Sequence, residues 1–412
     1  MKLRAALEAV MLQSGEAFAA AIEGGAPRLL SKDVIADQLG SLELGLVLTH
    51  QDAATAILEV IASPSVRTRT HLVRVLDAYT LLAFLHQTPD VQKAMSRVFD
   101  NAQIWLDTST VLPLLAETLI SDPDQRLQTT LLDAATASGV RLHVTDGVIE
   151  ELLSHMELCL AYLNRNEQWE GGPPYLYSAY VLSGRDERLL PDWLANVRGD
   201  MNPEQDIEEY LSHHYTITKR SLRELADSAD AALRGAVQEL FREKRSRRRR
   251  SENVVDRLTA HDVENVVGVI ELRKGRRAPL GYEAWWLTLD GAAFGLRDWL
   301  RDQLGRDAPD SPVLSPDYFS QLLRLGPLRR ASTAGNESLP LIVDVSRLEQ
   351  IPVQLIEEAR KTRAAFAGYD ELRVQREVRD ALTRLRGTLR KNHDYAGEIS
   401  RDVASSIAKA TR

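Results

Sequence analysis

The stretch that decides the fold is Ile104-Trp105-Leu106-Asp107-Thr108-Ser109-Thr110, a short apolar run that ends in an acid and three hydroxyl residues. A stretch rich in leucine and alanine follows it. An apolar run of this length, closed by turn residues and followed by helical spacing, predicts a buried strand, a turn and a helix. Asp107 would then stand at the carboxyl end of the strand.

The same order of elements returns twice along the chain. Val140 to Val144 is a second apolar run, after which Thr145 can cap a helix that contains Val148 and Leu152. A third run, 284–289, ends at Asp290 and leads into another helical pattern. Strands that alternate with helices predict an α/β fold with a parallel sheet.

Helical patterns flank and interrupt this unit. Residues 1–102 are expected to be helical, and residues 333–412 to form a mostly helical, heavily charged C-terminal region. Between them we expect an α/β domain over 103–332 with a helical insertion at about 157–252. In the C-terminal region the candidate packing positions are Val374, Val378, Leu382 and Leu385.

Composition excludes several classes of protein. Of the 412 residues 44% are apolar, so the chain can bury a core, and its net charge of −8 argues against a generic polyanion binder. The single cysteine, Cys159, rules out a disulfide scaffold and a cysteine-based metal site, and it is typical of a reducing compartment. Because neither a membrane span nor a signal-peptide pattern stands out, we expect a cytoplasmic protein without membrane contact.

The familiar catalytic motifs are missing from the sequence. The nine histidines form no HExxH spacing, and there is no GxGxxG, GxxxxGK[ST] or GxSxG. Zinc hydrolysis, nucleotide binding and serine hydrolysis therefore lack support. Any chemistry has to rest on carboxylates.

Several acids stand where a parallel sheet would bring them together. Asp107 and Asp290 end strands, Glu150 and Glu151 lie in the helix after the second strand, and Asp262 lies beside the apolar face of a later helix. The carboxyl ends of neighbouring parallel strands open onto one crevice. Carboxylate oxygens are suited to Mg²⁺ and Mn²⁺. Taken singly, each acid is more often a helix cap or a solvated side chain than a ligand. Their order along the chain is what supports a shared site.

This ordered set resembles the PIN domain, over about 103–156 and 253–330. Members of that family are metal-dependent nucleases with a parallel sheet flanked by helices, and three or four acids hold one or two Mg²⁺ or Mn²⁺ ions. Most cleave RNA, and some structure-specific relatives cleave DNA. The resemblance implies that the catalytic and metal-binding residues are Asp107, Glu151, Asp262 and Asp290.

Two positions stay open within the resemblance. The helical wheel does not choose between Glu150 and Glu151, and Glu151 is preferred because the family places its acid directly before an apolar residue. The interval from there to Asp262 is much longer than in a compact member, and Asp256 and Glu264 compete for the third position. The supporting residues are expected to be Thr108 and Thr288, which match hydroxyl residues beside the family's acids.

A nucleic acid also needs a positive surface. The expected nucleic-acid-binding residues are Arg245, Arg247, Arg248, Arg249 and Arg250. The same run reads equally well as a solvated helix end.

The resemblance implies an endoribonuclease that cleaves RNA with a metal-activated water, and richness in Ala, Leu and Arg suggests a bacterial source. The alternatives are a structure-specific DNA nuclease and a catalytically silent scaffold. In the scaffold the helical termini would bind a protein partner or a second copy of the chain. Since all four acid positions are filled, the sequence favours catalysis.

Overall fold

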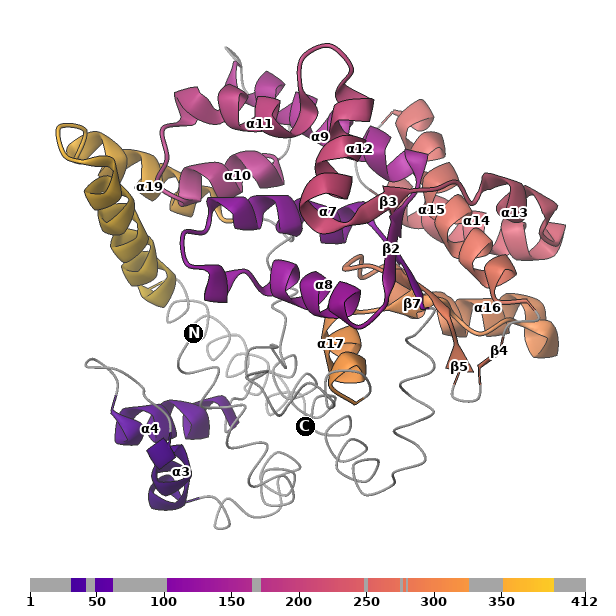
Figure 1. Cartoon of the computed structure of the whole chain (residues 1–412), viewed down its shortest axis with the longest axis horizontal. Helices are drawn as coiled ribbons and strands as arrows, with labels where there is room; N and C mark the ends of the chain where they lie inside the picture. The colour runs from indigo at the N-terminus through magenta and orange to yellow at the C-terminus, as the bar shows by residue number, and fades with distance from the viewer. Residues whose placement is uncertain are drawn as a thin grey trace, which may run out of the picture.

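A five-stranded, all-parallel sheet flanked by helices forms the centre of the protein (Figure 1). The computed structural model describes residues 31–41, 49–61, 102–164, 172–247, 251–274, 277–278, 281–325 and 351–388. The strands of the sheet are β1 (Gln103–Leu106), β2 (Arg141–Val144), β3 (Ile217–Lys219), β6 (Ala284–Leu287) and β7 (Val313–Leu314). The prediction of an α/β fold with a parallel sheet is confirmed.

The order of the strands in the sheet is β3-β2-β1-β6-β7. Later strands are therefore added first on one side of β1 and then on its other side. Ile104 of β1 lies opposite Leu142 of β2 on one side and opposite Trp285 of β6 on the other. The chain first builds outward to β2 and β3, and then returns across β1 to add β6 and β7. In open α/β sheets, such a reversal leaves a crevice at the carboxyl ends of the two strands where it occurs.

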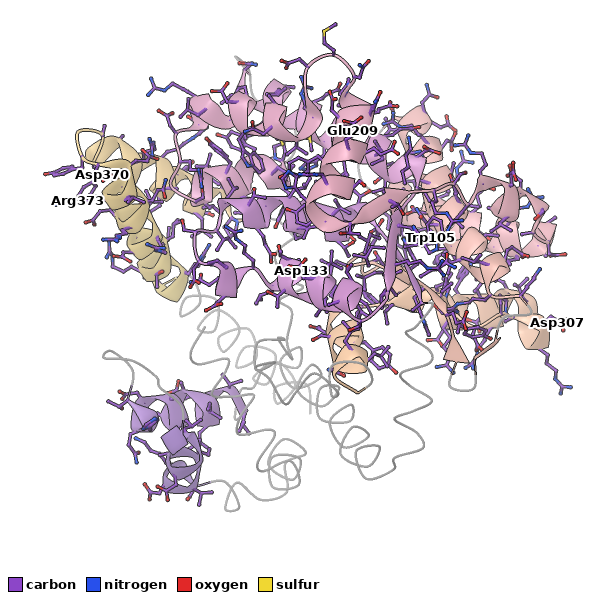
Figure 2. All side chains as sticks on the ribbon, viewed as in Figure 1. Trp105, Asp133, Glu209, Asp307, Asp370 and Arg373 are labelled. Carbon is purple, nitrogen blue, oxygen red and sulfur yellow. The ribbon has the colours of Figure 1, made fainter. Side chains whose placement is uncertain are left out.

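Helices cover both faces of the sheet, so its strands are buried on both sides. Ile104 and Leu106 pack into the larger core, whereas Trp105 and Trp286 pack into the smaller one. Figure 2 labels Trp105 in the interior of the molecule. The alternation along β1 follows from the strand period of two.

The two helical layers separate clearly in Figure 1. The helices of the larger core are α7 (Thr108–Ala116), α8 (Leu127–Ala137), α9 (Asp146–Leu163), α10 (Tyr175–Leu182), α11 (Leu190–Arg198), α12 (Pro203–Tyr215), α17 (Pro316–Leu325) and α19 (Val353–Ala365). The helices of the smaller core are α13 (Arg223–Ser228), α14 (Ala231–Ser246), α15 (Glu252–Leu272) and α16 (Leu296–Leu304).

Short elements complete the described fold. The strands β4 (Arg277–Ala278) and β5 (Gly281–Tyr282) form an antiparallel pair. The 3-10 helices are η2 (Leu39–Ser41), η3 (Glu117–Leu119), η4 (Pro123–Gln125), η5 (Glu187–Leu189), η6 (Ala293–Gly295) and η7 (Gly305–Asp307).

The structure differs from the expected all-helical insertion at one place. Within 157–252, residues of β3 pair with β2 and form the edge of the main sheet. Thr218 secures this edge, since its Oγ1 lies 2.7 Å from His143 Nδ1. A strand of three residues is too short to show alternation in the sequence.

The terminal regions are helical where they are described. Near the N-terminus, α3 (Lys32–Gln38) packs against α4 (His50–Ile61). Residues 371–388 are helical, and Val374, Val378 and Leu382 are buried as predicted. The rest of 1–102 and of 333–412 lies outside the described residues. None of the helices in the described ranges combines the length and apolar character needed to cross a bilayer.

Candidate active site at the carboxyl ends of β1 and β6

Asp107 is both the first residue after β1 and the N-cap of α7. Its Oδ2 accepts a hydrogen bond from the backbone N–H of Ser109 at 3.3 Å and another from the Ser109 hydroxyl. Thr288, directly after β6, donates a third hydrogen bond from its Oγ1 at 2.7 Å. Asp107 therefore caps the start of α7 and also interacts with the other acids. The residue is almost fully buried.

Hydroxyl groups join the ends of β1 and β6. Thr288 Oγ1 accepts from the backbone N–H of Asp290 at 2.9 Å, and Ser109 Oγ accepts from that of Leu289 at 2.9 Å. Thr288 was expected beside the acids and lies there. Thr108 does not bind an acid, because its buried hydroxyl has no partner among the described residues. Ser109 takes the role that was assigned to Thr108. Its position two residues after an N-cap aspartate is the signal that could have identified it.

Asp262, from the middle of α15, lies at the same crevice in a bidentate ion pair. Arg245 donates from Nε to Asp262 Oδ2 and from Nη2 to Asp262 Oδ1, both at 2.9 Å. Its Nη2 also lies 3.6 Å from Asp290 Oδ2. Only 18% of the Arg245 side chain is exposed. Arg245 was expected on an exposed basic surface, but it lies in the acid cluster, because the last turn of α14 packs against α15.

His261 joins the remaining acids and was not anticipated from the sequence. Its Nδ1 lies 3.0 Å from Glu151 Oε1, and its Nε2 lies 3.3 Å from Glu150 Oε2. The ring packs on Gly147, where a Cβ would lie 2.5 Å from His261 Cγ. Burial by itself would lower the pKa of His261, but the hydrogen bond to Glu151 and the nearby carboxylates outweigh it and raise that pKa. An imidazolium can donate to both glutamates at once.

The electrostatics distinguish Glu151 from Glu150. The pKa of Asp107 is raised to about 6: burial has the largest effect, the charges of Glu151 and Asp290 also raise it, and the hydroxyl hydrogen bonds oppose them. Burial likewise raises the pKa of Asp262 to about 7, against the lowering effect of Arg245 and with a raising effect of Glu151. Glu151 thus acts on both buried aspartates. The side chain of Glu150 is 39% exposed at the rim.

The four carboxylates brought together in this way are named the acid cluster: Asp107, Glu151, Asp262 and Asp290. Asp107 directly follows β1, Asp290 lies three residues after the end of β6, Glu151 lies on α9 and Asp262 lies on α15.

The other candidates for the third acid point elsewhere. Asp256 is half-exposed and lies 3.2 Å from Arg242 of α14. Glu264 is buried but accepts from the backbone N–H of Leu222 at 3.0 Å, so it closes the start of α13. Both residues lie on α15 and face different directions from Asp262 because of the helical period.

The structure describes only part of the basic run. Arg247 is exposed and pairs with Glu243 of its own helix at 2.6 Å. The expected residues Arg248, Arg249 and Arg250 lie outside the described residues.

A cavity of about 580 Å³ lies between α13, α14 and α15. His261 lines it together with Arg223, Arg234 and Arg242. Three acids, Asp227, Asp256 and Glu264, also line it, and none of the residues of the acid cluster does. Its volume is in the range of small-molecule and nucleotide sites.

Within the described ranges, no group of three or more His, Cys, Asp or Glu side chains is arranged so that it could hold a metal ion. Arg245 places a positive charge at the acid cluster. No protein family, curated protein or solved structure matches this chain.

Proposed function

We propose that this protein is a metal-dependent phosphodiesterase of the PIN-like nuclease type, with RNA as the favoured substrate. The observation that supports it best is the position of the acid cluster. Two buried aspartates, Asp107 and Asp262, meet Glu151 and Asp290 at the reversal point of a parallel sheet. Buried carboxylates with raised pKa values in a crevice are typical of functional sites.

The donor chemistry suits a hard divalent cation. All four residues of the acid cluster offer carboxylate oxygens, which Mg²⁺ and Mn²⁺ prefer. The raised pKa values of Asp107 and Asp262 indicate that Arg245 alone does not offset the cost of burying these charges. When bound, a divalent cation activates water and neutralises charge on the phosphodiester. The side chains that would hold it are Asp107, Glu151, Asp262 and Asp290.

The neighbouring residues position the acids. Ser109 and Thr288 both donate to Oδ2 of Asp107 and so hold this carboxylate in place. His261 holds Glu151 against α15. Such outer contacts orient ligands and tune their basicity.

A second candidate function has one specific observation in its favour. Arg245 already forms a bidentate ion pair with Asp262. In this alternative the acids stabilise the fold as an ion-pair network and do not take part in catalysis. The protein would then be a silent scaffold that binds a partner through its helical regions. A DNA nuclease with the same site is the third candidate.

The test is cleavage of end-labelled single-stranded RNA and matched DNA in Mn²⁺, Mg²⁺ or EDTA. Wild type is compared with Asp107→Asn and Asp290→Asn, and with Asp256→Asn as a control acid on α15. We expect metal-dependent cutting that both cluster variants lose and the control keeps. Equal cutting by all four proteins, or none, would refute the nuclease proposal. Preference for DNA would reassign the substrate.

A further inference from the structure

Arg245 has an unusual place in the acid cluster. Its guanidinium uses two nitrogens on the two oxygens of Asp262 and stands 3.6 Å from Asp290. The side chain is largely buried, although it belongs to the last turn of α14, in a stretch of the sequence rich in arginine. Its neighbour Arg247 is 71% exposed in its side chain, so burial of Arg245 is specific to that position.

A guanidinium and a divalent cation compete for Asp262 in this geometry. Both carboxylate oxygens already accept hydrogen bonds from the arginine fork. A Mg²⁺ ligand oxygen lies about 2.0–2.1 Å from the ion, so a Mg²⁺ on Asp262 would stand close to the guanidinium, and the two positive charges would repel each other. Displacement of the guanidinium from Asp262 therefore favours binding of a cation there.

We propose that Arg245 is a resident counter-ion that competes with the divalent cation for the acid cluster and leaves when the cation binds. The inference rests on the proposed function, because it concerns the same site. The four carboxylates of the acid cluster are suitable ligands, yet among the described residues no group of side chains is arranged to hold a metal ion. A resident Arg245 explains both observations. In the cation-free protein Arg245 offsets part of the repulsion among the acids; in the loaded protein it would be freed.

The freed guanidinium has an evident new partner. Arginine binds phosphate with the same two-pronged geometry that it uses on a carboxylate. A substrate phosphodiester at the crevice would let Arg245 exchange Asp262 for phosphate. Nucleic acid and cation would then favour each other's binding, because coupling between two ligands is reciprocal.

The experiment measures Mn²⁺ binding to the full chain by calorimetry at pH 7.5, without nucleic acid. Wild type is compared with Arg245→Met, which keeps most of the side-chain length without the charge, and with Arg245→Lys, which keeps the charge without the fork. The matched control is Arg242→Met. Arg242 also joins α14 to α15, through Asp256, but outside the acid cluster. Asp262→Asn tests whether binding occurs at the cluster.

We expect Arg245→Met to bind Mn²⁺ about ten-fold or more tightly than wild type, in the usual range of coupling between sites. Arg245→Lys should lie between them and Arg242→Met should match wild type. Should Arg245→Met fail to fold, as judged by circular dichroism, the lysine variant carries the same comparison.

The outcomes separate the two proposals. If the Arg245 variants bind Mn²⁺ as tightly as wild type or more weakly, and Asp262→Asn does not bind it, the counter-ion proposal is wrong and the proposed metal site is supported. Tighter binding without cleavage of RNA or DNA upholds the counter-ion and overturns the nuclease. No binding by any variant overturns both.

Discussion

Replacement of Asp107 by asparagine should stabilise the cation-free protein at alkaline pH. Burial raises the pKa of this carboxyl from its ordinary 3.8 to about 6 in the folded chain. The folded state therefore holds the proton more tightly than the unfolded state. This group's contribution to stability is full below about pH 4 and is lost as the pH rises through 6.

The magnitude follows from the difference between the two pKa values. One pKa unit corresponds to about 1.4 kcal/mol, so at pH 8 the ionised, buried carboxylate costs about 3 kcal/mol. An asparagine removes the charge and keeps an oxygen that can accept from Ser109 and Thr288. Its buried amide NH₂ lacks a partner of its own, which costs about 1–2 kcal/mol. The net expectation is a gain of about 1–2 kcal/mol at pH 8 that shrinks towards zero by pH 5.

The assay is urea unfolding in EDTA at pH 8 and pH 5, followed by tryptophan fluorescence, since buried Trp105 lies two residues from Asp107. Asp256→Asn is the control and should change stability by less than about 0.5 kcal/mol, because its ion pair is exposed. The reasoning is refuted if Asp107→Asn is less stable than wild type at pH 8. It is equally refuted if the difference is the same at both pH values.

Three further changes test individual contacts. Glu117→Ala should lower the free energy of unfolding by roughly 2–4 kcal/mol in urea titrations, because its buried carboxylate accepts from two backbone N–H groups at the start of α8; an unchanged midpoint would contradict this. Gly147→Ala should displace the His261 ring, against which its Cβ would clash, and lower the pKa of that histidine, as followed by NMR titration; an unaltered titration would argue against the packing. Ser109→Ala should raise the pKa of Asp107 above about 6, because a hydrogen bond to the carboxylate is lost. Carbon-13 NMR of the aspartate carboxyls measures that pKa, and a fall would show that the bond does not act on the charged form.

The sequence determined that the fold is of the α/β type and that two acids, Asp107 and Asp290, follow strands of the sheet. Apolar runs that end in an acid or a threonine and lead into helical spacing are local signals, and β1, β2 and β6 formed where they stood. The strands β3 and β7 were not anticipated. With three and two residues they have no pattern of their own and depend on the neighbours they pair with.

Within the site, the sequence predicted which acids could meet but not what surrounds them. The hydroxyl that binds Asp107 belongs to Ser109 and not to Thr108, because the first turn of α7 directs only Ser109 at the carboxylate. In the sequence His261 is one of several scattered histidines. Its place in the site depends on the packing of α15 against Gly147 of α9.

Arg245 shows the limit most clearly. A run of arginines has the same sequence whether its members are exposed or paired. Helix packing decides the difference, because the turn of α14 that carries Arg245 lies against the turn of α15 that carries Asp262. Local periodicity thus determined the elements and their order. Contacts between residues far apart in the chain decided that a buried arginine shares the crevice with the acids, because a buried charge is stable only where a distant partner meets it.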